Sequence, residues 1–533
     1  MKIAELLLQT LEANGVRHIF GNPGTTEIPL VRMCENRKKL RYVVALSEVS
    51  AVPMADGYAR ATRSLGVVNL HVAPGLGNGS GALYTAGIVG TPLLVLVGGQ
   101  DRRFLHTQPI LHGPLEAMAK SVTKAVYTLT DAASAEFYIR KAIRTAMTSP
   151  TGPVALICPP DLLEEEIDAE PQAVTVPTLG GLASEDVHAF AAFLGNAKKP
   201  ALIAAEDAHW ANAGGELQRL AESINAPIYV APYTGVLPLA ASSRAYAGYL
   251  SPSRASIVKQ LAGHDALLMV GGNGFRTTLF SDAKLPQKKA WLGVDANFAW
   301  DEDEFALARV ADLKHALARI ADAAKPSRAP KTAMRAPLEI PAAKKDATLH
   351  PTRAVDAILK SFGNALLIDE SGLSTSDVKA LMQVAGGEYL INGSGGIGWG
   401  LAASVGAAIG QSARTIVALI GDGSALYASE AMWSAAHYNA RVLLVIFSNR
   451  RYATLNEAAA RITGHELDLF TIEPPVMDFS GLAKLYGWNY TSAANETELT
   501  AFLAQSKGVI AANTVLDLQL DPAVKPVTAA RHF

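Results

Sequence analysis

Short apolar runs, many of them rich in β-branched residues, alternate with helical patterns along most of the chain. A run that is apolar on both faces is typical of a strand buried in a parallel sheet, and its alternation with helices indicates βαβ units. The pattern predicts an α/β protein made of three consecutive doubly wound parallel-sheet domains. The runs lie at 18–20, 42–46, 67–71, 93–97, 154–158, 201–204, 227–230, 266–270, 290–294, 365–368, 389–391, 415–420, 442–447 and 509–518.

Two stretches without periodicity separate these blocks. Residues 161–184 are acidic and interrupted by Pro and Gly, and residues 324–351 are rich in Pro, Lys and Ala. Both compositions are typical of linkers. A chain of 533 residues suits three or four domains of about 150 residues each. We therefore expect domains at 1–165, 183–323 and 351–533.

Composition and charge exclude several classes of partner. Charged residues make up 18% of the chain, the net charge is -2, and Lys and Arg form no long run, which argues against binding to nucleic acid or to a membrane surface. The two cysteines show no spacing typical of a disulfide framework or a zinc site. The first residues are typical of an amphipathic helix, and no apolar run approaches the roughly 18 residues that span a bilayer. We expect a cytoplasmic protein.

The strongest chemical signal follows the run at 415–420, which leads into Gly421-Asp422-Gly423-Ser424. The next run ends at Ser448-Asn449, and the carboxyl ends of parallel strands in one βαβ unit lie at the same sheet edge. Asp422 and Asn449 can therefore converge and offer oxygen ligands to Mg²⁺, while the backbone N–H groups of Gly423 and Ser424 face an anion. An Asp N-cap with a turn Asn is the alternative interpretation.

A second signal is Glu48, which is surrounded by small and apolar residues with no Lys or Arg within a helical turn. This pattern predicts a buried carboxylate without a local partner, which costs several kcal/mol. Such a group is suited to sharing a proton with a heterocycle nitrogen. The alternative is an exposed position on a half-buried helix.

Glycine-rich loops follow two of the strands, at 73–79 and 393–398. The second loop matches GxGxxG, the pattern of dinucleotide-binding loops. We reject that interpretation because the next strand ends at Gly421-Asp422-Gly423, which is typical of a metal site rather than of a ribose contact.

Together these residues resemble the thiamine-diphosphate-dependent 2-oxo acid decarboxylase and carboligase family, in the acetolactate synthase-like superfamily, over nearly the whole chain. The resemblance implies thiamine diphosphate and Mg²⁺ as cofactors, and pyrimidine-binding, middle and diphosphate-binding domains in that order. It makes Asp422, Asn449 and the backbone carbonyl of Arg451 the metal ligands; the family commonly has Asn-Asn where this chain has Ser448-Asn449. The side chains of Arg450 and Arg451 are expected to be solvated.

The resemblance also assigns the remaining cofactor contacts. Glu48 would bond the pyrimidine ring, Ile397 would support the bent cofactor, and the carbonyl of Gly395 would accept its exocyclic amine. In this family Glu48 and Asp422 come from different subunits, so the resemblance implies a homodimer or homotetramer with active sites at the subunit interface. The other cofactor-binding positions are Gly24, Asn78, Gly372, Gly423, Ser424 and Tyr452.

Within the family the segments 20–27, 45–48, 55–59 and 69–71 resemble the benzoylformate decarboxylase branch. This branch implies that His71 is catalytic and that Thr25, in place of a serine, handles the substrate carboxylate. A second catalytic histidine is replaced by Thr278, and Ala458 stands where the phenyl pocket has a bulky aromatic residue. His112, which resembles a histidine of pyruvate-type decarboxylases, is a candidate for the missing proton donor; ordinary loop histidines are the alternative for His71 and His112.

The resemblance implies the non-oxidative decarboxylation of a small-molecule 2-oxo acid, benzoylformate-like, to an aldehyde and CO₂. Two alternatives stay open: a carboligase that transfers the decarboxylated fragment to an aldehyde or acyl acceptor, and a catalytically silent homologue. FAD binding by the middle domain and the side chain of the substrate also stay open.

Overall fold

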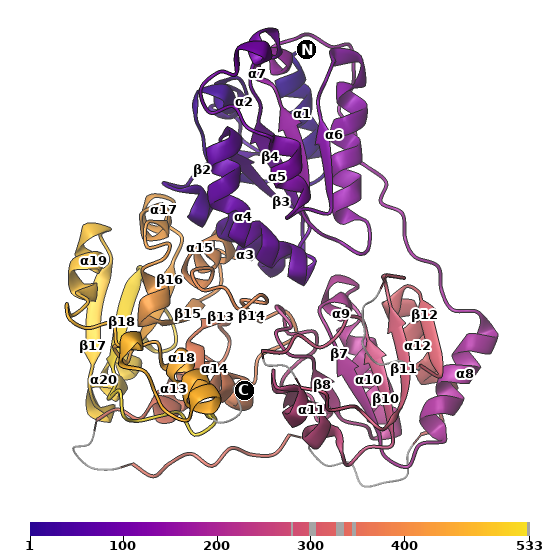
Figure 1. Cartoon of the computed structure of the whole chain (residues 1–533), viewed down its shortest axis with the longest axis vertical. Helices are drawn as coiled ribbons and strands as arrows, with labels where there is room; N and C mark the ends of the chain where they lie inside the picture. The colour runs from indigo at the N-terminus through magenta and orange to yellow at the C-terminus, as the bar shows by residue number, and fades with distance from the viewer. Residues whose placement is uncertain (279–280, 298–304, 327–334, 344–347, 530–533) are drawn as a thin grey trace.

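The computed structural model describes residues 1–278, 281–297, 305–326, 335–343 and 348–529. It contains three six-stranded sheets in which every neighbouring pair of strands is parallel, with helices on their faces. The three units built on these sheets lie at the corners of a triangle (Figure 1). The predicted fold class is therefore confirmed. Within the described ranges, no helix is long and apolar enough to cross a membrane.

The first sheet has the strand order β2-β1-β3-β4-β6-β5. Its inner strands β3, β4 and β6 are buried at every residue because helices cover both faces, as their continuous apolar runs predict. The predicted amphipathic first helix is α1 (Ile3–Ala13). The strands of this unit are β1 (His18–Asn22), β2 (Arg41–Val44), β3 (Gly66–Leu70), β4 (Leu93–Gly98), β5 (Ala125–Thr128) and β6 (Val154–Cys158). Its other helices are α2 (Ile28–Cys34), α3 (Glu48–Thr62), α4 (Val72–Val89), α5 (Leu115–Lys120), α6 (Ala132–Met147) and α7 (Pro160–Leu163).

The middle sheet has a different order, β12-β11-β10-β7-β8-β9. Numbered within the unit, this is the doubly wound order in which the chain starts at the centre and builds outward in both directions. Its strands are β7 (Pro200–Ala204), β8 (Ile228–Val230), β9 (Tyr246–Tyr249), β10 (Ala266–Val270), β11 (Lys288–Gly293) and β12 (Leu307–Val310). Its helices are α8 (Ser184–Gly195), α9 (Asp207–Trp210), α10 (Gly214–Ile224), α11 (Arg254–Leu261) and α12 (Leu313–Ala323).

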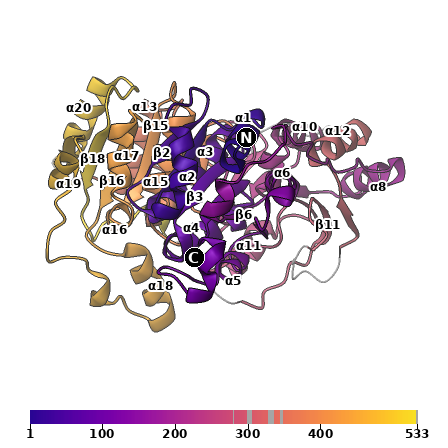
Figure 2. The ribbon, with the colours of Figure 1, turned by 90° about the horizontal axis from the view of Figure 1, so that it is seen from above.

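The third sheet, in the order β14-β13-β15-β16-β18-β17, repeats the order of the first. β15 and β16 pair in parallel with Gly421 opposite Phe447, which confirms the predicted βαβ unit. Its strands are β13 (Leu366–Glu370), β14 (Tyr389–Ile391), β15 (Ile416–Gly421), β16 (Val442–Ser448), β17 (Asn489–Ala493) and β18 (Thr514–Gln519). Its helices are α13 (Pro351–Ser361), α14 (Thr375–Leu381), α15 (Gly400–Gly410), α16 (Asp422–Ala425), α17 (Ala431–His437), α18 (Ala453–Thr463), α19 (Phe479–Leu485) and α20 (Glu496–Ser506). Seen from above, α18 projects to one side of this sheet (Figure 2).

The first and third units share one core across α3 and α15. A Cβ atom on Gly57 would overlap the carbonyl of Ala403, and one on Gly406 would overlap the carbonyl of Met54. Two glycines, one on each helix, therefore let the two backbones touch. This contact fixes the third unit against the first within one chain.

Candidate active site

A cavity of about 930 Å³ opens between the third unit and the middle unit. The carboxyl ends of β13, β14, β15 and β16 and the loops that follow them form its third-unit wall. All third-unit residues assigned to the cofactor or the metal line this one cavity, whereas Arg450, Ala458 and the first-unit candidates do not. These lining residues are Gly372, Gly395, Ile397, Asp422, Gly423, Ser424, Asn449, Arg451 and Tyr452.

Asp422 and the segment after β16 converge, as predicted. The Arg450 N–H donates to Asp422 Oδ2 at 2.6 Å, and Asn449 Oδ1 accepts from the Arg451 N–H at 3.1 Å. The Asp422 side chain is 5% exposed, and this burial raises its pKa to about 6, although backbone N–H groups of Arg450, Gly423 and Asn449 act in the opposite direction. Among the described residues no cationic side chain forms an ion pair with Asp422.

The residues present fit a hydrated Mg²⁺ and a diphosphate. A buried carboxylate without a cation, an amide oxygen and the Arg451 carbonyl are the oxygen donors that Mg²⁺ prefers. That carbonyl accepts one hydrogen bond, from the Ala453 N–H at 2.9 Å, and keeps a second lone pair. A Cβ on Gly423 would lie 2.6 Å from the Tyr452 ring, so only glycine forms this wall of the cradle. One prediction was wrong: the Gly423 N–H is not free, because it donates to Asp422 Oδ1 at 2.8 Å.

The loop after β14 presents Gly395 and Ile397 to the same cavity. Gly395 has φ +81°, which favours glycine, and a Cβ there would meet open space. Ile397 is 41% exposed in this structure and lines the cavity, which is unusual for a large apolar side chain. Glu370 accepts hydrogen bonds from the N–H groups of Gly398 and Gly400 at the end of the loop. Burial raises the pKa of Glu370 to about 7.

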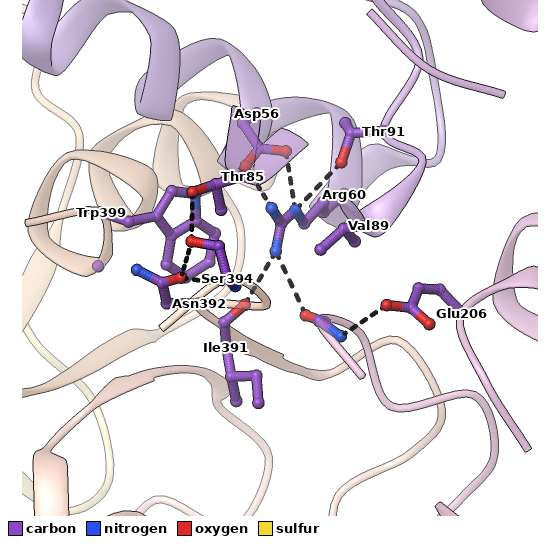
Figure 3. Close-up of polar contacts among 12 residues, drawn as sticks. Asp56, Arg60, Thr85, Val89, Thr91, Glu206, Ile391, Asn392, Ser394 and Trp399 are labelled. Carbon is purple, nitrogen blue, oxygen red and sulfur yellow. Dashed lines mark hydrogen bonds and ion pairs between the residues drawn. The ribbon is translucent and has the colours of Figure 1, made fainter. Parts of the chain in front are cut away.

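Arg60 holds the start of this loop from the first unit (Figure 3). Its guanidinium is fully buried and donates to Asp56 Oδ1 at 2.8 Å, to the Ile391 carbonyl at 2.9 Å and to the Gly235 carbonyl at 3.4 Å. The Trp399 indole donates to Asp56 Oδ2 at 2.7 Å. One arginine thus joins all three units at the strand end that leads to Gly395 and Ile397. The sequence analysis missed Arg60, because a lone arginine on a helix is usually a surface charge.

A second contact supports the loop beside Arg60. The hydroxyl groups of Thr85 and Ser394 lie 2.7 Å apart, and Asn392 Oδ1 accepts from the N–H groups of Ser394 at 3.0 Å and Gly395 at 3.2 Å (Figure 3). The first unit therefore contributes to the position of the cavity loop without lining the cavity.

Glu48 begins α3 and is 5% exposed, which confirms the predicted burial. Among the described residues no cationic side chain pairs with Glu48, in line with the prediction, and its partner is an amide 30 positions later: Asn78 Nδ2 donates to Glu48 Oε2 at 3.2 Å. A Cβ on Gly75 would lie 2.8 Å from Glu48 Oε1, so the glycine loop 73–79 makes room for this carboxylate. Glu48, Gly75 and Asn78 form a small group away from the cavity.

His71 lies beside a buried carboxylate that the sequence analysis did not single out. His71 Nδ1 is 2.8 Å from Glu27 Oε2, and Glu27 is 2% exposed and also accepts from the Gly24 N–H at 2.7 Å. Because a carboxylate accepts, this contact assigns the proton to Nδ1 and leaves Nε2 without a partner among the described residues. A Cβ on Gly24 would overlap the His71 ring, and the neighbouring Thr25 is exposed. Only the fold brings Glu27 to His71, 44 positions later in the chain.

The other first- and middle-unit candidates are placed as follows. His112 is exposed, and the next residue lies against the start of α4, where a Cβ on Gly113 would be 2.6 Å from the Ala73 Cβ. This places the His112 loop near His71. Thr278 is exposed on the middle unit and does not itself line the cavity, but its N–H donates at 2.9 Å to the carbonyl of Pro252, which does. Ala458 lies half-buried on α18.

The two arginines after Asn449 differ in the exposure and the partners of their side chains. Arg450 is 43% exposed and lies 3.4 Å from Glu473, in line with a solvated side chain. Arg451 is only 20% exposed, forms an ion pair with Glu466 and donates to the Pro522 carbonyl at 3.1 Å. The expectation of a solvated side chain was therefore wrong for Arg451, because the fold supplies partners from distant segments.

Comparisons with known proteins agree with this geometry. Three family models match: "Thiamine pyrophosphate enzyme, N-terminal TPP binding domain" at residues 1–123, the central domain at 187–320 and the C-terminal TPP binding domain at 370–513. The chain is 31% identical over 511 residues to a benzoylformate decarboxylase of Pseudomonas aeruginosa, covering 93% of this chain and 94% of the relative.

Two further matches extend the comparison. A putative acetolactate synthase large subunit of Mycobacterium tuberculosis is 28% identical, covering 91% of this chain and 93% of that protein. The solved structure of a thiamine diphosphate-dependent 4-hydroxybenzoylformate decarboxylase from Rhodococcus jostii superposes with a TM-score of 0.90 at 29% identity, covering 98% and 99% of the two chains. The chain thus belongs to the thiamine diphosphate-dependent enzymes, in the superfamily of benzoylformate decarboxylases and acetolactate synthases.

Proposed function

We propose that this protein is a thiamine diphosphate- and Mg²⁺-dependent lyase that decarboxylates a 2-oxo acid, benzoylformate-like, to an aldehyde and CO₂. The observation that carries the proposal is the convergence of Asp422 and Asn449 at one sheet edge, inside the cavity that Gly395 and Ile397 also line. The benzoylformate decarboxylase relative, which covers almost the whole chain, supports the same conclusion.

The third unit would hold the cofactor. Asp422, Asn449 and the Arg451 carbonyl would bind Mg²⁺, and the loop with Gly423 and Ser424 would face the diphosphate. Gly372 and Tyr452, which line the same cavity, would complete its wall. Thiamine diphosphate held there would supply a nucleophilic ring carbon for the substrate carbonyl and an electron sink for the pair left by CO₂.

The first unit would supply the groups that move protons. Glu48 would share a proton with the pyrimidine ring, and Asn78 keeps its carboxylate oriented. Because Glu48 does not line the cavity of its own chain, the Glu48 at each site would come from a second copy. We therefore propose a homodimer, or a tetramer built from such dimers, with two active sites between each pair of chains.

His71 and Thr25 would act on the substrate. The Glu27 carboxylate would hold the Nδ1–H of His71, so that Nε2 would take up a proton from solvent and deliver it to the carbon atom that lost CO₂. The exposed hydroxyl of Thr25 would donate to the substrate carboxylate, and Asn78 and Gly24 would border the cofactor. His112, on the loop near the start of α4, is the proposed second proton donor.

The test is release of CO₂ and aldehyde from purified protein with thiamine diphosphate and Mg²⁺, across aliphatic and aromatic 2-oxo acids. We expect equal amounts of the two products, with an aromatic acid preferred. No CO₂ from any acid would contradict the proposal and favour a silent homologue.

A carboligase is the second candidate function. It is favoured by Thr278, which replaces the second histidine and faces solvent on the middle unit. With fewer proton donors, transfer of the decarboxylated fragment to an aldehyde or acyl acceptor competes better with protonation. CO₂ released in excess over free aldehyde, together with a 2-hydroxy ketone, would establish this function.

A further inference from the structure

The cavity extends beyond the proposed cofactor site into a part that we call the lateral wing, lined by Tyr249, Lys379 and Arg335. Tyr249 ends β9 of the middle unit, Lys379 lies on α14 of the third unit, and Arg335 precedes α13 along the chain. The sequence analysis singled out none of the three, and the proposed mechanism does not use them.

Lys379 brings a positive charge to the wing without an anionic partner. Its Nζ lies 4.5 Å from the centre of the Tyr249 ring, and in the part of the chain that the structure describes it makes no hydrogen bond or ion pair. Burial lowers the pKa of Lys379 to about 8, while the charge of Asp369 acts to raise it. The amine is therefore mostly protonated at neutral pH, and a ring face satisfies none of its three N–H donors.

Tyr249 adds a hydroxyl group that has no partner. This hydroxyl is buried and makes no hydrogen bond among the described residues, which is a rare and costly state for a buried donor. Its ring packs edge-to-face on Tyr389 at 6.1 Å. The Tyr389 hydroxyl instead donates to Asp369 Oδ2 at 2.6 Å, so the neighbouring tyrosine is satisfied and Tyr249 is not.

The carboxylates that line the cavity are already engaged. Asp369 Oδ1 accepts from the N–H of Ser371 at 2.9 Å and from the hydroxyl of Thr375 at 3.1 Å, and Glu370 accepts backbone N–H groups. Arg335 adds a second cation, with its guanidinium 5.2 Å from the centre of the Tyr246 ring and one nitrogen donating to the Met382 carbonyl at 2.8 Å. The wing thus offers N–H and O–H donors to an added anion, while the oxygens of the nearby Asp369 are already hydrogen-bonded.

We infer that the lateral wing binds a carboxylate of a small molecule, with Lys379 and the Tyr249 hydroxyl as donors and Arg335 as a second positive charge. One ammonium and one phenol match the two oxygens of a carboxylate. Lys379 lies seven positions after Gly372, and both residues line the same cavity. The carboxylate can belong to the far end of a 2-oxo diacid substrate, which rests on the proposed function, or to a separate dicarboxylate effector.

The experiment uses the holoenzyme with thiamine diphosphate and Mg²⁺. Turnover of 2-oxoglutarate and of benzoylformate is measured for the wild type, Lys379→Met and Tyr249→Phe, and glutarate binding is measured by calorimetry. We expect Lys379→Met to weaken glutarate binding about 10-fold or more and Tyr249→Phe about 3-fold. Lys360→Met on α13, whose lysine is 72% exposed, is the matched control and should change neither measurement.

The outcomes separate the two sources of the carboxylate. If the ratio of kcat/KM for 2-oxoglutarate over that for benzoylformate falls about 10-fold in Lys379→Met, the carboxylate belongs to the substrate. If glutarate instead changes benzoylformate turnover in the wild type and not in Lys379→Met, the wing is an effector site. Glutarate binding that is absent in the wild type, or equal in all variants, would overturn the inference. Calorimetry gives this answer even if no 2-oxo acid is decarboxylated, which would contradict only the proposed function.

Discussion

The first and third units share one strand order but carry different chemistry at equivalent positions. The third strand of each unit is followed by His71 in the first and by Asp422 in the third. The edge strand at the start of each order is followed by Glu48 in the first and by the loop with Ile397 in the third. The fold therefore determines where side chains gather, at the carboxyl ends of the strands, and the side chains determine what they can bind.

The two regions also differ in how complete they are. The third unit's cofactor and metal candidates line one cavity, whereas the first unit's candidates form two small groups whose outer members, Thr25 and Asn78, are exposed. In the proposed dimer, the first unit of one copy would supply half of each site and would activate the cofactor that the third unit of the other copy holds.

The largest expected effect is a loss of turnover, and it separates activation of the cofactor from binding of the cofactor. We expect Glu48→Gln to lower kcat about 10²- to 10⁴-fold, because it removes the group that exchanges a proton with the cofactor, while Mg²⁺-dependent cofactor binding persists. Steady-state kinetics and calorimetry measure the two quantities. Glu116→Gln, an exposed position in the same unit, is the control. Full activity in Glu48→Gln would contradict the assigned role.

The next prediction concerns a change in the third unit that should weaken cofactor binding. Asp422→Asn removes the charge that would bind Mg²⁺, and we expect the affinity for Mg²⁺ and thiamine diphosphate to fall about 100-fold. Titration of the apoprotein with the metal and the cofactor measures this loss. Asp322→Asn, exposed on the middle unit, should leave the affinity unchanged. Equal affinities in the two variants would exclude Asp422 as a ligand.

A smaller effect tests how the first unit supports the third within one chain. Arg60→Lys keeps the charge but loses the planar fork that reaches Asp56 and Ile391, so the loop with Ile397 should be less well positioned. We expect about 10-fold weaker cofactor binding with an unchanged circular dichroism spectrum. Arg63→Lys, three positions later, is the matched control. The two variants binding equally well would show that Arg60 does not position the loop.

The smallest effect concerns stability rather than turnover. Burial raises the pKa of Glu370 to about 7 from 4.5, so the folded state binds more protons than the unfolded state between these values. Stability should therefore fall as pH rises through this window, by on the order of 3 kcal/mol. We expect Glu370→Gln to flatten the pH dependence of the urea midpoint of the apoprotein between pH 4.5 and pH 7. An unchanged slope would show that Glu370 is not the group responsible.

The sequence predicted every inner strand and the edge strands β2 and β14, and it missed β5, β9, β12 and β17. Each of these four lies at an edge of its sheet, and each is partly exposed. An edge strand faces solvent along one side and so lacks the continuous apolar run used as the signal. The third-unit site was predictable because its residues are consecutive in short motifs after predicted strands.

Contacts between distant segments could not be predicted from the sequence. Glu27 meets His71 and Arg60 meets Ile391 only because separate strands and units pack together. A charged residue in a turn or on a helix gives the same local pattern whether it faces solvent or a buried partner. The unpaired Lys379 was missed for the same reason.

In the proposed dimer each active site combines the first unit of one copy with the third unit of another. Mixing Glu48→Gln protein with Asp422→Asn protein, after dissociation and reassembly, tests it directly. A mixed dimer would carry one site with both changes and one intact site, so about a quarter of wild-type activity should return at equal amounts. No recovery from two inactive proteins that do form mixed dimers would contradict the claim, because it would place both residues of each site in the same chain.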